Sequence, residues 1–159
     1  MGTGKSSVGL HIAREIKGDF IDLDKLIEEK ENRAIAEIFK EKGEPYFRGL
    51  EKKFLKDVAN KKDQIIACGG GIVIDPENIK LMKDNGTVIC LTATADVILE
   101  RTRKFNHRPL LNVPDPQEAI QALLADRQKF YAQADVTIDT SEISIKEVAA
   151  RVLNSLPKH

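Results

Sequence analysis

Short apolar runs alternate with longer amphipathic segments along the chain, and this alternation limits the possible folds more than any other feature. Four apolar runs are candidate strands: Phe20-Ile21, which leads into Asp22, and residues 64–68, 87–91 and 136–138. Nearly continuous apolar runs of this length are typical of parallel strands that are buried on both faces. We therefore expect an α/β fold, a three-layer α/β/α sandwich with a central parallel sheet.

The segments between these runs carry helix start signals. Asp75 and Asp115 each precede a proline, which suits the first position of a helix that the aspartate caps. Ser144 is followed three residues later by Glu147, the spacing of a capping box. Helices are predicted to begin near these residues, and the charged segment 25–59 is also expected to be helical.

Composition excludes several functional classes. The 159 residues favour one domain, and 25 Lys and Arg balance 25 Asp and Glu, so no net basic charge suggests nucleic acid as a partner. No apolar stretch approaches the length of a membrane span, and no membrane partner is expected.

Cys68 and Cys90 each end or interrupt an apolar run and are predicted to be buried thiols in a reducing compartment. A monomer in the cytoplasm is the simplest expectation.

The start of the chain has the pattern of a phosphate-binding loop. It reads Gly2, Thr3, Gly4, Lys5, Ser6 and Ser7, the second half of the P-loop motif, and an amphipathic segment follows. Glycines let backbone N–H groups wrap around phosphates at a helix N-terminus. Lys5 is predicted to reach the β- and γ-phosphates of a nucleotide, and the Ser6 hydroxyl to coordinate Mg²⁺. The alternative is a chance Gly-Lys-Ser sequence at a flexible N-terminus.

Four further motifs follow in order: Ile21-Asp22-Leu23-Asp24, Gly43-Glu44-Pro45-Tyr46-Phe47-Arg48, Cys68-Gly69-Gly70-Gly71 and Arg108-Pro109-Leu110-Leu111. Each is weak evidence alone, but five motifs in this order and spacing are specific. Together they make the chain resemble the shikimate kinase family over essentially its whole length.

This resemblance implies an ATP-dependent small-molecule kinase with a P-loop, nucleoside-monophosphate-kinase-like fold and a Mg²⁺ cofactor. The expected reaction transfers the γ-phosphoryl group of ATP to the 3-hydroxyl of shikimate in aromatic amino acid (chorismate) biosynthesis, so shikimate and ATP are the expected small-molecule partners. Residues 1–159 are then a single kinase domain, with a substrate-binding helical region at about 24–60 and a lid at about 104–116.

In the resembled family the first strand carries the P-loop and lies centrally in the sheet. The first glycine of the full motif and that strand are not in this chain, which begins inside the motif. Because a buried central strand contributes stabilisation comparable with that of a whole domain, we expect the natural protein to begin upstream of Met1. Weak or absent activity is expected of the chain without that strand.

On the nucleotide side, the resemblance assigns ATP binding to residues 2–7 and Mg²⁺ binding to Ser6 and, through water, Asp22. Arg108 in the lid is expected to meet the transferring phosphoryl group and neutralise its charge. Arg101 is expected to stack on adenine, and the alternative for this residue is a solvated helix face.

On the acceptor side, the resemblance places hydroxyl groups of shikimate on Asp24, which is also a candidate general base. The alternative is that Asp24 caps a helix beginning near Lys25.

Arg48 and Arg127 are expected to bind the shikimate carboxylate, because a planar guanidinium binds carboxylates in bidentate fashion. For Arg127 the alternative is a surface arginine. The backbone amide of Gly70 is expected on the substrate, and the alternative is a flexible turn.

Two other functions stay open at this point. The first is another small P-loop kinase, acting on gluconate or a nucleoside monophosphate, which would share the Gly-Lys-Ser start but not the later motifs. The second is a non-catalytic relative of the same fold. A GTPase is disfavoured, because the Asn60-Lys61-Lys62-Asp63 sequence that resembles a guanine-reading motif precedes a strand.

Overall fold

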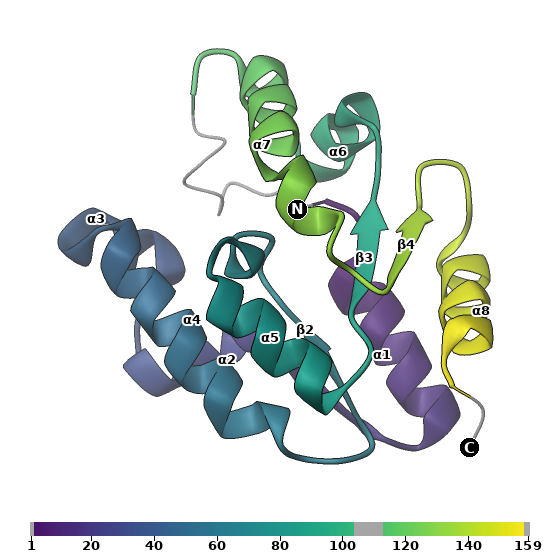
Figure 1. The fold of residues 1–159 in the computed structure, drawn as a ribbon. Coiled ribbons are helices and arrows are strands. Elements are labelled where there is room, and N and C mark those ends of the chain that lie inside the picture. Colours follow the sequence, from purple (N-terminus) through teal and green to yellow (C-terminus); the bar gives the residue numbers. More distant parts are fainter. Residues whose placement is uncertain (1, 104–112, 158–159) are drawn as a thin grey trace.

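The computed structural model describes residues 2–103 and 113–157 (Figure 1). Within these ranges lie four strands: β1 (Asp19–Asp22), β2 (Gln64–Ala67), β3 (Ile89–Thr92) and β4 (Val136–Asp139). They lie at the predicted apolar runs, with ends that differ by one or two residues. The helices are α1 (Lys5–Ile16), α2 (Leu23–Glu31), α3 (Ile35–Lys42), α4 (Glu44–Ala59), α5 (Pro76–Asn85), α6 (Ala95–Thr102), α7 (Pro116–Tyr131) and α8 (Ile145–Ser155), with the 3₁₀ turn η1 (Ile72–Ile74).

All strand pairs in the described residues are parallel, as predicted, but they form two pairs. β1 pairs with β2 from Asp19↔Gln64 to Asp22↔Ala67, and β3 pairs with β4 from Ile89↔Val136 to Thr92↔Asp139. β2 and β3 are not hydrogen-bonded to each other. The expected central sheet is therefore present as two parallel halves.

Helix α1 joins the two halves through a shared hydrophobic core. Val8 and Ile12 of α1 are buried and belong to one cluster with Ile138 of β4 and Val148 of α8. Ile65 of β2 packs against the same cluster. The end of α1 that carries the phosphate loop is thus held by both strand pairs.

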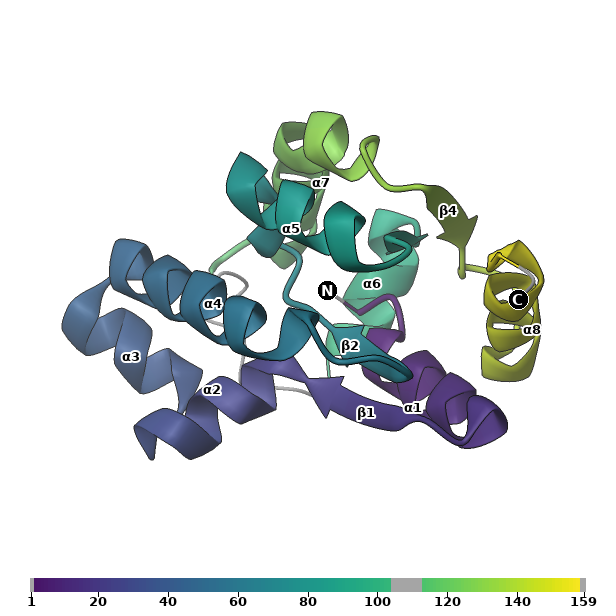
Figure 2. The same cartoon turned by 60° about the horizontal axis from the view of Figure 1, so that its bottom comes forward.

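The helices α2, α3 and α4 gather at one end of the molecule, opposite α8 (Figures 1 and 2). They enclose a second core, to which Leu23, Ile27, Ile38, Phe47, Leu50, Phe54, Leu55, Val58 and Ile72 contribute buried side chains. These helices cover the segment predicted to be helical and charged. A third, smaller core of Ala93, Ile98 and Ile120 fixes α6 against α7.

The predicted helix starts are confirmed by side-chain caps. Asp75 accepts a hydrogen bond from the amide of Glu77 at 2.9 Å, and Asp115 accepts one from that of Glu118 at 2.9 Å. Ser144 and Glu147 form the reciprocal capping box. Among the described residues, no helix combines the length and apolar character needed to cross a membrane.

Candidate active site

The phosphate loop, residues 2–7, has the backbone shape that its glycines permit. Gly2 and Gly4 have φ angles of 63° and 89°, in the left-handed region that side chains disfavour. A Cβ at Gly2 would also lie 3.0 Å from the Cγ2 atom of Thr102. Gly4 caps α1, whose first turn contains Lys5 and no acidic residue. The loop therefore presents a helix N-terminus and a lysine, the arrangement that favours bound phosphate.

The two residues predicted to hold Mg²⁺ lie together. The Ser6 hydroxyl donates a hydrogen bond to Oδ2 of Asp22 at 2.7 Å, although the two residues are 16 positions apart. Both supply oxygen, the ligand that Mg²⁺ prefers, and Mg²⁺ usually keeps several waters beside one or two carboxylates. The residues present therefore fit this ion.

Asp22, and not Asp24, caps the helix that begins near Lys25. Oδ1 of Asp22 accepts a hydrogen bond from the Lys25 amide at 3.4 Å, and Asp24 lies in the first turn of α2. The capping role weighed for Asp24 is therefore wrong. Asp24 instead faces the triple-glycine segment, because a Cβ at Gly69 would lie 3.2 Å from its Oδ1 atom.

Arg48 is held between two glutamates on α4. Its Nε and Nη2 atoms donate to Oε1 of Glu44 at 3.1 and 2.8 Å, and its Nη1 atom donates to Oε2 of Glu51. Glu44 is 45% exposed and Glu51 only 1%. Burial, opposed by Arg48, raises the pKa of Glu51 from its ordinary 4.5 to about 7, and the charge of Asp24 contributes to this rise.

Glu51 is not among the site residues predicted from the sequence, although its position in the sequence carries a signal. It lies on the apolar face of α4 between Phe47 and Leu55, where a charged residue is costly unless it is paired. It also lies three residues after Arg48, so a helix brings the two side chains together.

Two of the three glycines make room for these charged groups. A Cβ at Gly71 would overlap the guanidinium of Arg48, and one at Gly69 would lie 2.8 Å from Oε1 of Glu51. Neither glycine has a positive φ, so close packing and not backbone conformation requires them. The Gly70 carbonyl accepts a hydrogen bond from the Tyr131 hydroxyl at 2.9 Å, a contact that the sequence did not reveal. The flexible-turn alternative does not account for this packing.

Arg127 is buried on α7, with 8% of its surface exposed, so the surface-arginine alternative is wrong. Its charge opposes the raised pKa of Glu51, which places it near that carboxylate. Asp24, Arg48, Glu51 and Arg127 thus come from three helices and lie around the triple glycine. We call this set the acid–arginine cluster.

Arg101 makes specific contacts at the other end of the site. Its Nη1 atom donates to the Thr140 hydroxyl at 3.0 Å and to the Gly2 carbonyl at 3.4 Å, and its Nη2 atom donates to the Thr140 carbonyl at 2.7 Å. The alternative of a solvated helix face is therefore wrong. Arg108 lies outside the described residues, as does most of the predicted lid; its last residue, Pro116, begins α7.

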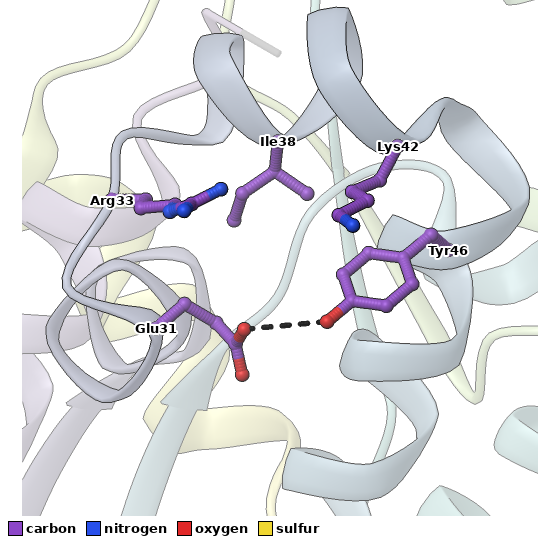
Figure 3. Close-up of a pocket in the computed structure, with 5 residues that line it drawn as sticks. All are labelled: Glu31, Arg33, Ile38, Lys42 and Tyr46. Carbon is purple, nitrogen blue, oxygen red and sulfur yellow. Dashed lines mark hydrogen bonds between the residues drawn. The ribbon is translucent and has the colours of Figure 1, made fainter.

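Two cavities lie near these helices. One of about 340 Å³ borders Arg48 and Gly71, next to the acid–arginine cluster. The other, of about 290 Å³, is lined by Glu31, Arg33, Ile38, Lys42 and Tyr46, which point into it (Figure 3). It contains none of the predicted site residues, and its Tyr46 hydroxyl is already directed at Glu31, 3.5 Å away. The candidate site is therefore the region between the phosphate loop and the acid–arginine cluster.

A phosphate loop with Mg²⁺-type ligands at the end of β1, together with a compact cluster of arginines and carboxylates at the end of the neighbouring β2, defines a P-loop kinase of small molecules. Comparison with known proteins is consistent with this class and narrows it. A family model described as shikimate kinase matches residues 1–157. The chain belongs to the shikimate kinase family.

Similar proteins include a shikimate kinase of Caldanaerobacter subterraneus, 45% identical over 99% of this chain and 92% of the relative. A shikimate kinase of Thermoanaerobacter pseudethanolicus is 44% identical over 98% of this chain and 91% of the relative. Among solved structures, shikimate kinase from Acinetobacter baumannii in complex with shikimate matches with a TM-score of 0.93 and 34% identity, over 97% of this chain and 87% of that one. These similarities confirm the predicted fold class.

Proposed function

We propose that this protein transfers the γ-phosphoryl group of ATP to the 3-hydroxyl of shikimate, which yields shikimate 3-phosphate and ADP in aromatic amino acid biosynthesis. The observation that carries the proposal is the acid–arginine cluster, packed against Gly69 and Gly71 just after β2. The neighbouring end of β1 carries Asp22, which accepts a hydrogen bond from Ser6 of the phosphate loop. The cluster offers fixed positive groups for a small acid, and the loop offers backbone amides and Lys5 for a polyphosphate.

At the nucleotide end, residues 2–7 bind the phosphates. Lys5 places a positive charge at the β- and γ-phosphates, where negative charge must be stabilised during transfer. Ser6 and Asp22 would hold Mg²⁺, which supplies charge neutralisation at the phosphate oxygens when bound. Arg101 and Arg108 complete the ATP site, Arg108 by meeting the transferring phosphoryl group.

At the acceptor end, Arg48 and Arg127 bind the carboxylate of shikimate, and the Gly70 amide contacts the same molecule. The surroundings of Arg48 would let its guanidinium exchange one glutamate partner for the substrate carboxylate. Its pair with the exposed Glu44 contributes about 0–1 kcal/mol, so a substrate carboxylate displaces it at little cost. Its pair with the buried Glu51 persists and keeps the guanidinium in place.

Asp24 binds the reacting hydroxyl group and accepts its proton as the oxygen attacks phosphorus. The transition state of phosphoryl transfer is loose and requires positioning more than a strong base. Orientation of the hydroxyl is therefore the larger part of this role. The packing of Asp24 against Gly69 supports a fixed carboxylate.

We further propose that the enzyme uses Mg²⁺ and acts as a monomer in the cytoplasm. The free thiols of Cys68 and Cys90 fit a reducing compartment. The single kinase domain with a helical substrate region at about 24–60 and a lid at about 104–116 is part of the same proposal.

A coupled assay of ADP release by the full-length protein tests the function. We expect MgATP turnover that depends on shikimate and is absent with gluconate or AMP as acceptor. Turnover with gluconate or AMP and none with shikimate would assign the protein to another small-molecule kinase specificity. Binding of ATP without turnover on any acceptor would support a non-catalytic relative.

A further inference from the structure

The residue that follows β4 connects three separate parts of the nucleotide end. Thr140 is 2% exposed, and its hydroxyl lies 3.1 Å from the Thr3 carbonyl and 3.0 Å from the Thr92 carbonyl. The same hydroxyl accepts from Nη1 of Arg101 at 3.0 Å. One buried hydroxyl therefore contacts the phosphate loop, the end of β3 and α6.

The hydrogen-bonding capacity of the Thr140 hydroxyl limits which of its neighbours can accept its proton. A threonine hydroxyl has one proton to donate and two lone pairs to accept with. Arg101 donates to one of the lone pairs. The single proton is directed at either the Thr3 or the Thr92 carbonyl. The Thr92 carbonyl already accepts a hydrogen bond from the Thr140 amide at 2.9 Å. The Thr3 carbonyl therefore depends more on the hydroxyl proton of Thr140.

The Thr3 carbonyl needs a protein donor because of its location. Thr3 is 5% exposed, so water has little access to its polar groups. A buried backbone carbonyl without a donor costs about as much as a lost hydrogen bond. The Thr140 hydroxyl thus joins the phosphate loop to a strand 137 residues further along the chain.

Arg101 strengthens the same link. Its guanidinium binds both the hydroxyl and the carbonyl of Thr140, and its contact with the Gly2 carbonyl reaches the loop one residue before Thr3. Two successive carbonyls of the loop, at Gly2 and Thr3, are thereby held by groups behind it. In a trans peptide the N–H of the next residue points away from the carbonyl, so the amides of Thr3 and Gly4 are directed to the opposite side and are available for phosphate.

We infer that Thr140 is a positioning residue for nucleotide binding: its hydroxyl, together with Arg101, fixes the phosphate loop against the ends of β3 and β4. This inference rests on the proposed ATP site and adds to it a residue that acts through its contacts with Thr3 and Arg101. Loss of the hydroxyl should loosen the loop and weaken MgATP binding, while the acid–arginine cluster stays intact.

The test substitutes Thr140→Val, which keeps the shape and removes the hydroxyl. We expect MgATP affinity, titrated without shikimate, to fall about tenfold, the effect of one lost hydrogen bond to a charged group. The Michaelis constant for ATP should rise similarly and that for shikimate should stay unchanged. Thr140→Ser, which retains the hydroxyl, should restore MgATP affinity, and Thr140→Cys, a weak donor, should give an intermediate value.

Thr137→Val is the matched control, because it makes the same change at an exposed position of β4, three residues before Thr140. If Thr140→Val does not fold, the Cys variant carries the test. A lower melting temperature with unchanged MgATP affinity would show a structural role alone and overturn the inference, and so would an equal rise in both Michaelis constants. Because MgATP titration requires no phosphoryl transfer, it separates this inference from the proposed acceptor.

Discussion

Replacing Glu51 by glutamine should change how the stability of the protein depends on pH. The Glu51 carboxylate is 1% exposed, and burial raises its pKa from 4.5 to about 7 despite the opposing charges of Arg48 and Arg127. A group with a raised pKa binds its proton more tightly in the folded protein than in the unfolded chain. Its contribution to stability is therefore complete below about pH 4.5 and is lost as the pH rises to about 7.

The size of the effect follows from the two pKa values. Integrating the difference in bound protons between pH 5 and pH 8 gives a loss of about 2–3 kcal/mol in the free energy of unfolding. Glutamine at this position carries no titrating proton, so the variant lacks this loss. The other carboxylates with shifted pKa values, such as Asp75 and Asp139, titrate alike in both proteins and cancel in the comparison.

The assay is urea unfolding of wild type and Glu51→Gln at a series of pH values. We expect the stability of the wild type relative to the variant to fall by about 2–3 kcal/mol from pH 5 to pH 8. Glu29→Gln, the same change at an exposed position of α2, controls for the substitution itself. A wild-type minus Glu51→Gln difference that stays constant with pH would refute the reasoning that burial dominates at Glu51.

Three further predictions concern the site. Gly71→Ala should raise the Michaelis constant for shikimate because its Cβ would displace the Arg48 guanidinium. The control is Gly49→Ala, which has open space around it inside α4 and should stabilise the protein by about 0.5–1 kcal/mol. Unchanged shikimate kinetics in Gly71→Ala would contradict the packing of Gly71 against Arg48. Lys5→Met should abolish transfer with little change in melting temperature, and retained turnover would remove Lys5 from the phosphate site. Arg48→Ala should raise the Michaelis constant for shikimate about a hundredfold and that for ATP far less; an equal rise for both substrates would speak against carboxylate binding by Arg48.

The features that sequence predicted best are those set by neighbouring residues. The caps at Asp75, Asp115 and Ser144 depend on a side chain and an amide two or three positions away, so a local pattern is sufficient. The left-handed glycines of the phosphate loop likewise follow from a short motif. Ser6 and Asp22 are both predicted Mg²⁺ ligands from their motifs, and the hydrogen bond between them shows that the two motifs are adjacent in the fold.

The features that sequence missed depend on distant parts of the chain. The sequence around Glu51 indicates that this glutamate lies on the apolar face of α4, but it does not reveal that Gly69 packs against its carboxylate. The hydrogen bonds of Tyr131 to Gly70 and of Thr140 to Thr3 cross 61 and 137 positions. The arrangement of the strands in two pairs is also a tertiary result, since each apolar run is compatible with several neighbours.

The most direct test of the account is to follow phosphorus during the reaction. In ³¹P NMR of the full-length protein with MgATP and shikimate, we expect one phosphate monoester of shikimate to form for each ADP, and negligible ADP when shikimate is omitted. Equal ADP formation with and without shikimate, or an acid that remains unphosphorylated while ATP is consumed, would contradict the account.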